Sequence, residues 1–446
     1  MFDDNRPTRR EFVKTVGQAA ATSLVALNAP ALAAQKRRRY AILGTGERGC
    51  LMWGRPVAEQ YGHVVQFVGL CDVNPKRVAV AREVIGVDCP AFTSFDEMCD
   101  RARPDLLVIT TIDAFHSQYI VKALDRGIDV MTEKPMVIDA AQCQAVLDAE
   151  KRTGRKILVT FNYRYPPKHQ KIKEVLLEGE IGRINSVDLN WYLDVYHGAD
   201  YFRRWHRLRA RSGSLWVHKA THHFDLVNWW LDADPVEVMA QADLRVYGRN
   251  GAFRSTHCRP CPHKSECRFH YDMTKEPSRM KLYADCEDAD HYYRDGCVFR
   301  EDVDIFDTMA AVVTYSNGVT MSYSLNAFMP FEGYRLAFNG EKGRLEIRDF
   351  DRQPWQVPEP TEIFLTKSFG ERKAISVPQS EGEHGGGDEI IRDIIFGGRH
   401  VPEYMRLPDS RAGAMSCLTG IAARTSVDRK QPVKISELVR LEPRSL

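Results

Sequence analysis

The sequence predicts an α/β protein with a parallel sheet in its N-terminal half and a large, mostly antiparallel sheet in its C-terminal half. Short apolar runs alternate with helical patterns between residues 40 and 165, which is the order that builds a right-handed parallel sheet. In the second half, two alternating strands meet at Asn317-Gly318, a strong hairpin signal. Together these two patterns indicate the fold class.

A glycine-rich turn follows the first predicted strand. Residues 40–43 run into Gly44-x-Gly46-x-x-Gly49, the order of a buried strand, a tight turn and the first turn of a helix in dinucleotide-binding folds. The free N–H groups at such a helix start bind a pyrophosphate. The second predicted strand, 64–72, ends in Asp72 about 20 residues after the last glycine, where a carboxylate accepts from the ribose hydroxyls.

Asp72 also bears on the choice of cofactor. A carboxylate repels a 2′-phosphate, so the sequence favours NAD over NADP. Asn74, Lys76 and Arg77 follow at once and could hold a phosphate, which keeps NADP possible.

The remaining elements follow from periodicity and turn signals. In the first half we expect helices at 75–85, 117–126 and 140–153, and strands at 105–111, 128–136 and 156–165. In the second half we expect strands at 184–193 and 235–248, hairpins at 307–328 and 334–349, helices at 215–231 and 410–427, and a closing segment at 432–438.

Composition excludes several classes of partner. The chain has 446 residues, 43% of them apolar, and its 62 basic and 60 acidic residues leave a net charge of +2. No basic stripe is present, so we expect no nucleic-acid partner. No apolar run approaches the ~20 residues that span a bilayer.

The N-terminus has the pattern of an export signal. Arg9-Arg10 is followed by Phe12 and Lys14, then by an alanine-rich apolar segment at 16–32 with small residues for cleavage near Ala33. We therefore expect residues 1–33 to be a twin-arginine signal and the protein to be periplasmic or otherwise exported. A basic amphipathic helix is the alternative. Export away from free NAD predicts a tightly held cofactor.

Several segments together resemble the Gfo/Idh/MocA superfamily, the glucose–fructose oxidoreductase and inositol dehydrogenase type of enzyme. The matching pieces are GTGERG, GLCDVN, VITTIDAFHSQYIVKALDRGIDVMTEKPM, FNYRY, GEIGRI, HHFDLVNWWL and GEHGGGDEIIRDII. The resemblance implies a Rossmann domain at 34–160 and a C-terminal α/β domain at 161–446. It also implies a carbohydrate substrate and a dimer or tetramer.

The resemblance also implies a set of catalytic and cofactor-binding residues. Lys134, from the EKP segment, would face the reacting carbon, and His222 would be the general base. His218 stands where the family usually has an aspartate, so the usual orienting carboxylate is missing at this position. The expected cofactor-binding residues are Gly44, Thr45, Gly46, Glu47, Arg48, Gly49, Asp72, Thr111, His116, Glu133, Lys134 and Asn162.

Other residues are candidates for substrate contact or for metal binding. The expected substrate-binding residues are Tyr163, Arg164, Trp205, Lys219 and His384. His218 and His222, spaced i and i+4, would lie on one face of a helix and also match metal-ligand spacing. Alternatively, both histidines are hydrogen-bonded core residues.

A cysteine-rich insertion at 254–300 distinguishes this chain. Cys258, Cys261, Cys267 and Cys286 predict a zinc site that staples a long loop, and Cys297 is a fifth cysteine that fits no pattern neatly. Disulfides and an iron–sulfur cluster are the alternatives.

The sequence as a whole predicts an NAD(P)-dependent oxidoreductase acting on a sugar or polyol hydroxyl. Two alternatives stay open. One is an NAD-dependent glycosidase that oxidises its substrate transiently, and the other is a sugar-binding protein that keeps the cofactor without catalysis.

Overall fold

The computed structural model describes residues 36–378 and 382–441. The expected export signal, residues 1–33, lies outside the described residues. Within the described ranges, no helix is both long and apolar enough to cross a membrane.

The first half of the chain forms a parallel six-stranded sheet in the order β3-β2-β1-β4-β5-β6. Its strands are β1 (Arg38–Leu43), β2 (Val65–Cys71), β3 (Ala91–Phe92), β4 (Leu106–Ile109), β5 (Asp129–Thr132) and β6 (Ile157–Val159). Its helices are α2 (Arg55–Tyr61), α3 (Pro75–Ile85), α4 (Phe95–Ala102), α5 (His116–Asp125) and α6 (Ala140–Thr153). This confirms the predicted parallel sheet and places the glycine turn after β1, at the carboxyl edge of the strands.

The second half forms a nine-stranded sheet in the order β14-β13-β12-β11-β7-β10-β9-β8-β15. Its strands are β7 (Ile184–Asp194), β8 (Pro235–Asp243), β9 (Thr308–Tyr315), β10 (Thr320–Met329), β11 (Glu332–Gly340), β12 (Gly343–Arg352), β13 (Thr361–Lys367), β14 (Arg372–Ala374) and β15 (Val433–Lys434). Only the β7–β10 pair is parallel among the described pairings, so the sheet is mostly antiparallel, as predicted.

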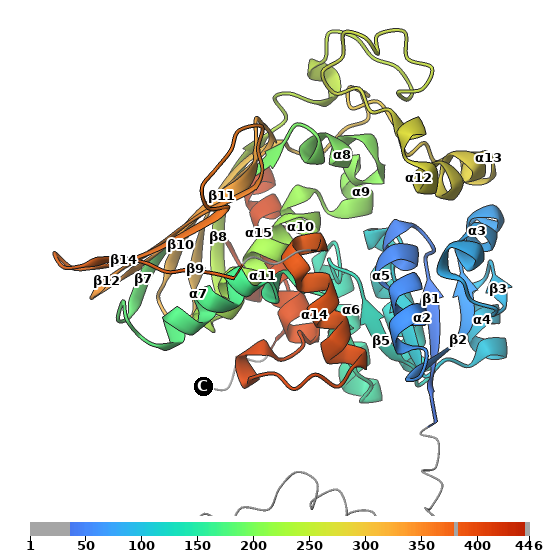
Figure 1. The fold of residues 1–446 in the computed structure, drawn as a ribbon, viewed down its shortest axis with the longest axis horizontal. Coiled ribbons are helices and arrows are strands. Elements are labelled where there is room, and N and C mark those ends of the chain that lie inside the picture. The colour runs from blue at the N-terminus through green and yellow to red at the C-terminus, as the bar shows by residue number, and fades with distance from the viewer. Residues whose placement is uncertain (1–35, 379–381, 442–446) are drawn as a thin grey trace, which may run out of the picture. The chain divides into compact units, whose positions relative to one another are not determined.

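Helices cover one face of this large sheet, between it and the parallel sheet (Figure 1). They are α7 (Pro167–Leu177), α8 (His197–Arg203), α9 (Arg209–Ser212), α10 (Leu215–His218), α11 (Ala220–Leu231) and α15 (Ser410–Arg429). Every residue of α11 is buried. Along β9 and β10, buried side chains alternate with more exposed ones, which is the pattern of a sheet whose other face is solvated.

The C-terminal segment returns to the first sheet. Helix α14 (Gly387–Phe396) places the Phe396 ring 5.8 Å from Tyr40 of β1 and 5.6 Å from Tyr61 of α2, measured between ring centroids. The Tyr61 hydroxyl donates to Asp393 of α14. A helix near the end of the chain therefore completes the core of the N-terminal domain.

The cysteine-rich insertion has little regular structure. Its described helices are short: α12 (Pro277–Leu282) and α13 (Glu287–Asp290). Figure 1 shows α12 and α13 beside α3. A hydrogen bond joins the two regions: the side chain of Asn74, at the start of α3, donates to the carbonyl of Cys286 over 2.8 Å.

Several predicted elements were wrong in extent, including the strands expected at 128–136 and 235–248, which end at Thr132 and Asp243. Two other differences bear on the site. The strand expected at 156–165 ends at Val159, and the chain then turns through Asn162–Arg164, so these side chains leave the sheet edge. The helix expected at 215–231 is interrupted at Lys219. At this break α15 approaches closely, since a Cβ on Gly420 would lie 2.1 Å from the carbonyl oxygen of Trp216.

Candidate active site

The glycine turn brings backbone segments into close contact. Gly44 has φ +94°, and a Cβ there would lie 2.7 Å from the backbone of Thr110. A Cβ on Gly49 would lie 2.2 Å from the carbonyl oxygen of Gly44. At Gly46 the nearest atom to an added Cβ is the hydroxyl of Tyr283, at 3.2 Å. The first and third glycines are therefore required by backbone packing, whereas the neighbour of Gly46 is a side chain of the insertion.

Asp72 lies directly after β2, as predicted. Its Oδ2 accepts from the backbone N–H of Thr45 over 2.8 Å and from the Thr45 hydroxyl over 3.1 Å. Its other oxygen accepts from the N–H of Asn74 over 3.0 Å. The side chain is buried. A carboxylate fixed beside the glycine turn fits a dinucleotide whose ribose donates hydroxyls to it.

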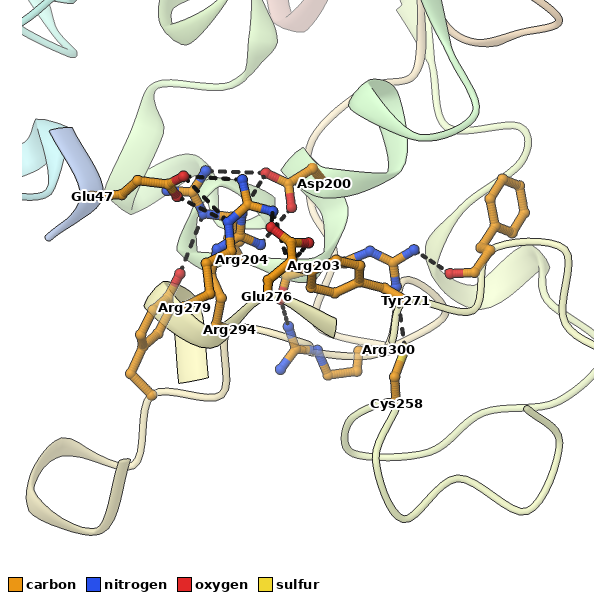
Figure 2. Close-up of polar contacts among 12 residues, drawn as sticks. Glu47, Asp200, Arg203, Arg204, Cys258, Tyr271, Glu276, Arg279, Arg294 and Arg300 are labelled. Carbon is orange, nitrogen blue, oxygen red and sulfur yellow. Dashed lines mark hydrogen bonds and ion pairs between the residues drawn. The ribbon is translucent and has the colours of Figure 1, made fainter. Parts of the chain in front are cut away.

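The insertion covers this glycine turn, which the sequence did not predict. The Tyr283 hydroxyl accepts from the N–H of Glu47 over 2.9 Å, and Arg279 forms a 3.0 Å ion pair with the Glu47 carboxylate. Figure 2 shows Arg279, Arg204 and Arg294 gathered between Glu47 and Asp200. A backbone N–H that would bind a phosphate oxygen is thus in contact with the insertion.

The basic residues after Asp72 also contact the insertion. Lys76 pairs with Asp288 at 2.6 Å, and Arg77 pairs with Asp290 at 2.7 Å. These cations are therefore neutralised by acids from α13. Arg77 also lies 3.5 Å from Asp72, so both basic residues are already paired with carboxylates and are not free to bind a 2′-phosphate.

Lys134 follows β5 in the Glu133-Lys134-Pro135 segment, whose Lys134–Pro135 peptide bond is cis. Its Nζ donates to the carbonyl of His218 over 3.4 Å. Burial lowers the pKa of Lys134 to about 8, against the opposing influence of Glu133 and Asp113. Glu133 accepts from Arg48 and from the Trp53 indole, each over 2.8 Å.

His218 has a carboxylate partner that the sequence did not indicate. Its Nδ1 lies 2.5 Å from Oδ2 of Asp113, the first residue after the loop that follows β4. Both side chains are buried, and burial raises the pKa of Asp113 and lowers that of His218. A carboxylate from a different element therefore lies beside His218.

His222 lies on α11, with its ring centroid 4.6 Å from that of Tyr163. Its Nδ1 is buried and has no hydrogen-bond partner among the residues that the structure describes. Burial, reinforced by the charges of Lys134 and Lys219, holds the pKa of His222 well below its ordinary value. The imidazole is therefore neutral at pH 7.

The remaining candidates for substrate contact have distinct surroundings. The Lys219 ammonium lies 5.3 Å from the Tyr163 ring centroid and 5.6 Å from that of Trp191. Trp205 stacks on His206, with ring centroids 3.7 Å apart. Arg164 instead forms a bidentate ion pair with Asp225 of α11, so its guanidinium is engaged by the protein.

The C-terminal segment closes the site from the other side. His384 pairs with Asp388 at 3.1 Å, and Asp388 pairs with Arg48 of the glycine turn at 3.3 Å. Asp388 also accepts from the side chain of Asn162. His116 joins two further loops, because its ring nitrogens contact the carbonyls of Pro135 and Thr111. Asp388 thus joins two of the predicted cofactor-binding residues, Arg48 and Asn162, to the predicted substrate contact His384.

The cysteines of the insertion divide into two locations. Cys258, Cys261, Cys267 and Cys297 line one small cavity, whereas the Cys286 thiol contacts the carbonyl of Lys281 near α3. The prediction that Cys258, Cys261, Cys267 and Cys286 together hold zinc is not supported, and Cys286 lies apart from the other three. In the described ranges, no group of three or more His, Cys, Asp or Glu side chains is arranged to hold a metal ion. His218 and His222 therefore do not belong to such a group either.

Comparison with known families agrees with this architecture. A model described as an oxidoreductase family with an NAD-binding Rossmann fold, Gfo/Idh/MocA, matches residues 38–161. The model for the C-terminal α/β domain of the same family matches residues 173–435.

Individual relatives are similar over different lengths. A Bacillus subtilis (strain 168) protein, YteT, named only as an oxidoreductase, is 40% identical over 420 residues, which are 90% of this chain and 98% of YteT. An inositol 2-dehydrogenase/D-chiro-inositol 3-dehydrogenase of Lactiplantibacillus plantarum is 25% identical over 41% of this chain and 48% of its own. The WlbA dehydrogenase of Bordetella pertussis, solved with NADH and UDP-GlcNAcA, shares the fold with a TM-score of 0.62 and 18% identity, over 91% of this chain and 100% of WlbA.

Proposed function

This chain belongs to the Gfo/Idh/MocA family of oxidoreductases, and from that premise we propose that it transfers hydride between a sugar or polyol hydroxyl and a tightly held NAD. The observation that carries the proposal is the meeting of Lys134, His222 and the His218–Asp113 pair at the carboxyl edge of the parallel sheet. Ligands bind at this edge in open α/β folds.

The residues divide the proton chemistry between them. When bound, NAD supplies the acceptor for the hydride that leaves the substrate carbon. His222, which is neutral and whose Nδ1 has no partner among the described residues, accepts the hydroxyl proton. The Lys134 ammonium stabilises the negative charge that develops on the substrate oxygen. His218, bonded to Asp113, is a further polar group beside Lys134.

The aromatic side chains fit a carbohydrate. Tyr163 and Trp205 offer flat apolar faces of the kind that pack on sugar rings, while Lys219 and His384 bring donors for hydroxyls. The inositol dehydrogenase named among the relatives acts on a polyol, which supports the same substrate class.

Two contacts support slow release of the cofactor. Tyr283 and Arg279 lie over the glycine turn, so the insertion has to move before a dinucleotide can leave. An enzyme that keeps its nicotinamide would regenerate it with a second substrate.

The experiment that tests the function is a spectrum of the purified protein before and after adding a panel of sugars and polyols. We expect bound nicotinamide to survive gel filtration, and the NADH absorption band to rise with one of these compounds. Release of an aglycone from a glycoside without net NADH would instead favour the glycosidase. A protein that binds no nucleotide and whose spectrum does not change with any sugar or polyol would contradict the proposal.

A substitution at Asp72 tests the cofactor assignment. Asp72→Ala removes a charged acceptor for ribose hydroxyls, and one such hydrogen bond is worth about 1.5–3 kcal/mol. NAD binding should therefore weaken by about 10- to 150-fold. NADP binding should not improve, because Asp288 and Asp290 stay nearby. Isothermal titration of cofactor-stripped protein measures both affinities.

The matched control is Asp88→Ala, an exposed acid of the same domain that pairs only with Arg82 in the described contacts. Its affinity for NAD should equal that of the wild type. A gain in NADP affinity on Asp72→Ala would mean that Lys76 and Arg77 are free to bind a phosphate after all.

A further inference from the structure

Four cysteines of the insertion surround one cavity of about 20 Å³. Cys258, Cys261 and Cys267 come from one stretch of chain, and Cys297 comes from another. We propose that these four sulfurs bind an iron–sulfur cluster. The inference rests on the cysteines alone and does not depend on the oxidoreductase function.

Backbone hydrogen bonds hold the two stretches together. The N–H of Cys258 donates to the carbonyl of Asp295 over 2.8 Å, and the N–H of Cys297 donates to the carbonyl of Thr256 over 3.1 Å. An antiparallel bridge joins His257 to Gly296 between them. Cys258 and Cys297 are therefore placed side by side by the fold.

The thiols are free and are not paired with one another. All of the cysteines at 258, 261, 267 and 297 are unpaired. Disulfide formation would bring two sulfurs into bonding distance and join only one pair at a time. A group bound at the centre engages every one of these sulfurs at once.

The arrangement suits a cluster better than a single ion. A zinc ion needs three or four ligands gathered around one point, and the described residues contain no such group. In a four-iron cluster each iron takes one cysteine sulfur, and inorganic sulfide supplies its other ligands. Cysteines set around a cavity, instead of converging on one point, meet that requirement.

The surroundings of the sulfurs also match a cluster of negative charge. The Arg203 guanidinium donates to Sγ of Cys258 over 3.3 Å, and the backbone N–H of Phe299 donates to Sγ of Cys297 over 3.4 Å. Hydrogen bonds to the sulfurs are a main means by which proteins stabilise and tune these clusters. Arg203 is itself buried, so its charge acts with little screening.

The local chain has little regular secondary structure of its own. Residues 251–272 contain no helix and no multi-residue strand. Structureless loops longer than about 12–15 residues are uncommon in compact domains unless something ties them down. A cluster that joins residues 258–267 to residue 297 would do so.

The site is adjacent to the contacts that cover the glycine turn. Arg203, which contacts Cys258, precedes Arg204 in the chain, and Arg204 pairs with Asp200 beside Arg294 (Figure 2). A cluster here would therefore fix the base of the insertion from which Arg279 reaches Glu47.

The test is the metal and sulfide content of the full-length protein, purified without oxygen from cells with intact cluster assembly. We expect iron and acid-labile sulfide in equal amounts, together with a brown visible absorption that bleaches on reduction. Cys297→Ser should lose most of the iron. Cys286→Ser, the matched variant in the same insertion but away from the cavity, should keep the wild-type content.

Three results would overturn the proposal. Zinc without sulfide would replace the cluster by a single-ion site, and disulfides found by mass spectrometry under non-reducing conditions would exclude both. Equal iron loss in the two serine variants would show that the cavity is not the site. Because the wild-type iron and sulfide content is measured directly, the test holds even if Cys297→Ser fails to fold. NAD binding is measured separately and is not affected by this outcome.

Discussion

Replacing Lys134 by methionine is expected to lower turnover by ~10² or more while leaving the cofactor bound, because the variant keeps the length of the side chain and loses its charge. The ammonium lies at the carboxyl end of β5 and contacts the carbonyl of His218. Single-turnover reduction of bound NAD by the identified substrate measures the effect. Lys122→Met, on the exposed surface of α5, is the control and should keep full activity.

The same residue predicts the pH dependence. Burial lowers the pKa of Lys134 to about 8, so the side chain is charged below that pH and neutral above it. Oxidation of the substrate should therefore slow as pH rises through about 8, and Lys134→Arg should move this loss to higher pH. A wild-type profile that rises through pH 8 would assign Lys134 the role of base.

Replacing His222 by alanine should have the second large effect, a decrease in turnover of about 10²–10⁴. The neutral imidazole is the proposed acceptor of the hydroxyl proton, and no other described histidine packs on the Tyr163 ring as closely. Cofactor content should remain that of the wild type, which separates a catalytic loss from misfolding. His222→Gln keeps a polar side chain of similar size and should be equally slow.

A result in which His222→Ala turns over normally would shift the base to His218. Its Nδ1 is held by Asp113, an arrangement that orients an imidazole for proton transfer. Asp113→Asn would then become the decisive variant.

The first sheet and its turn were predictable because their signals are local. Gly44, Gly49 and Asp72 stand in a fixed order along the chain, and close backbone packing requires the two glycines. Helices α3 and α6 begin and end as predicted, since Asn74 and Asp139 cap their first turns and Gly86 and Gly154 end them in left-handed conformation.

The contacts that complete the site were not predictable, because they join distant segments. Asp113 meets His218, and Tyr283 meets Glu47, through folding of the whole chain and with no pattern of spacing. The same reason explains the misplaced cysteine. In the sequence, nothing distinguishes Cys286 from Cys297 as the fourth cysteine of the set. Only the pairing of residues 256–258 with 295–297 places Cys297 beside Cys258.

The position of α14 has a consequence for the order of events during synthesis. Phe396 packs on Tyr40 and Tyr61, and Asp388 pairs with Arg48 of the glycine turn. A ribosome adding about 5–20 residues per second needs roughly 10–45 s to travel from the end of the first sheet to this helix. During that time the nascent N-terminal domain exposes the apolar surface that α14 later covers. The nucleotide site is therefore finished among the last parts of the protein to be made, although its motif is among the first.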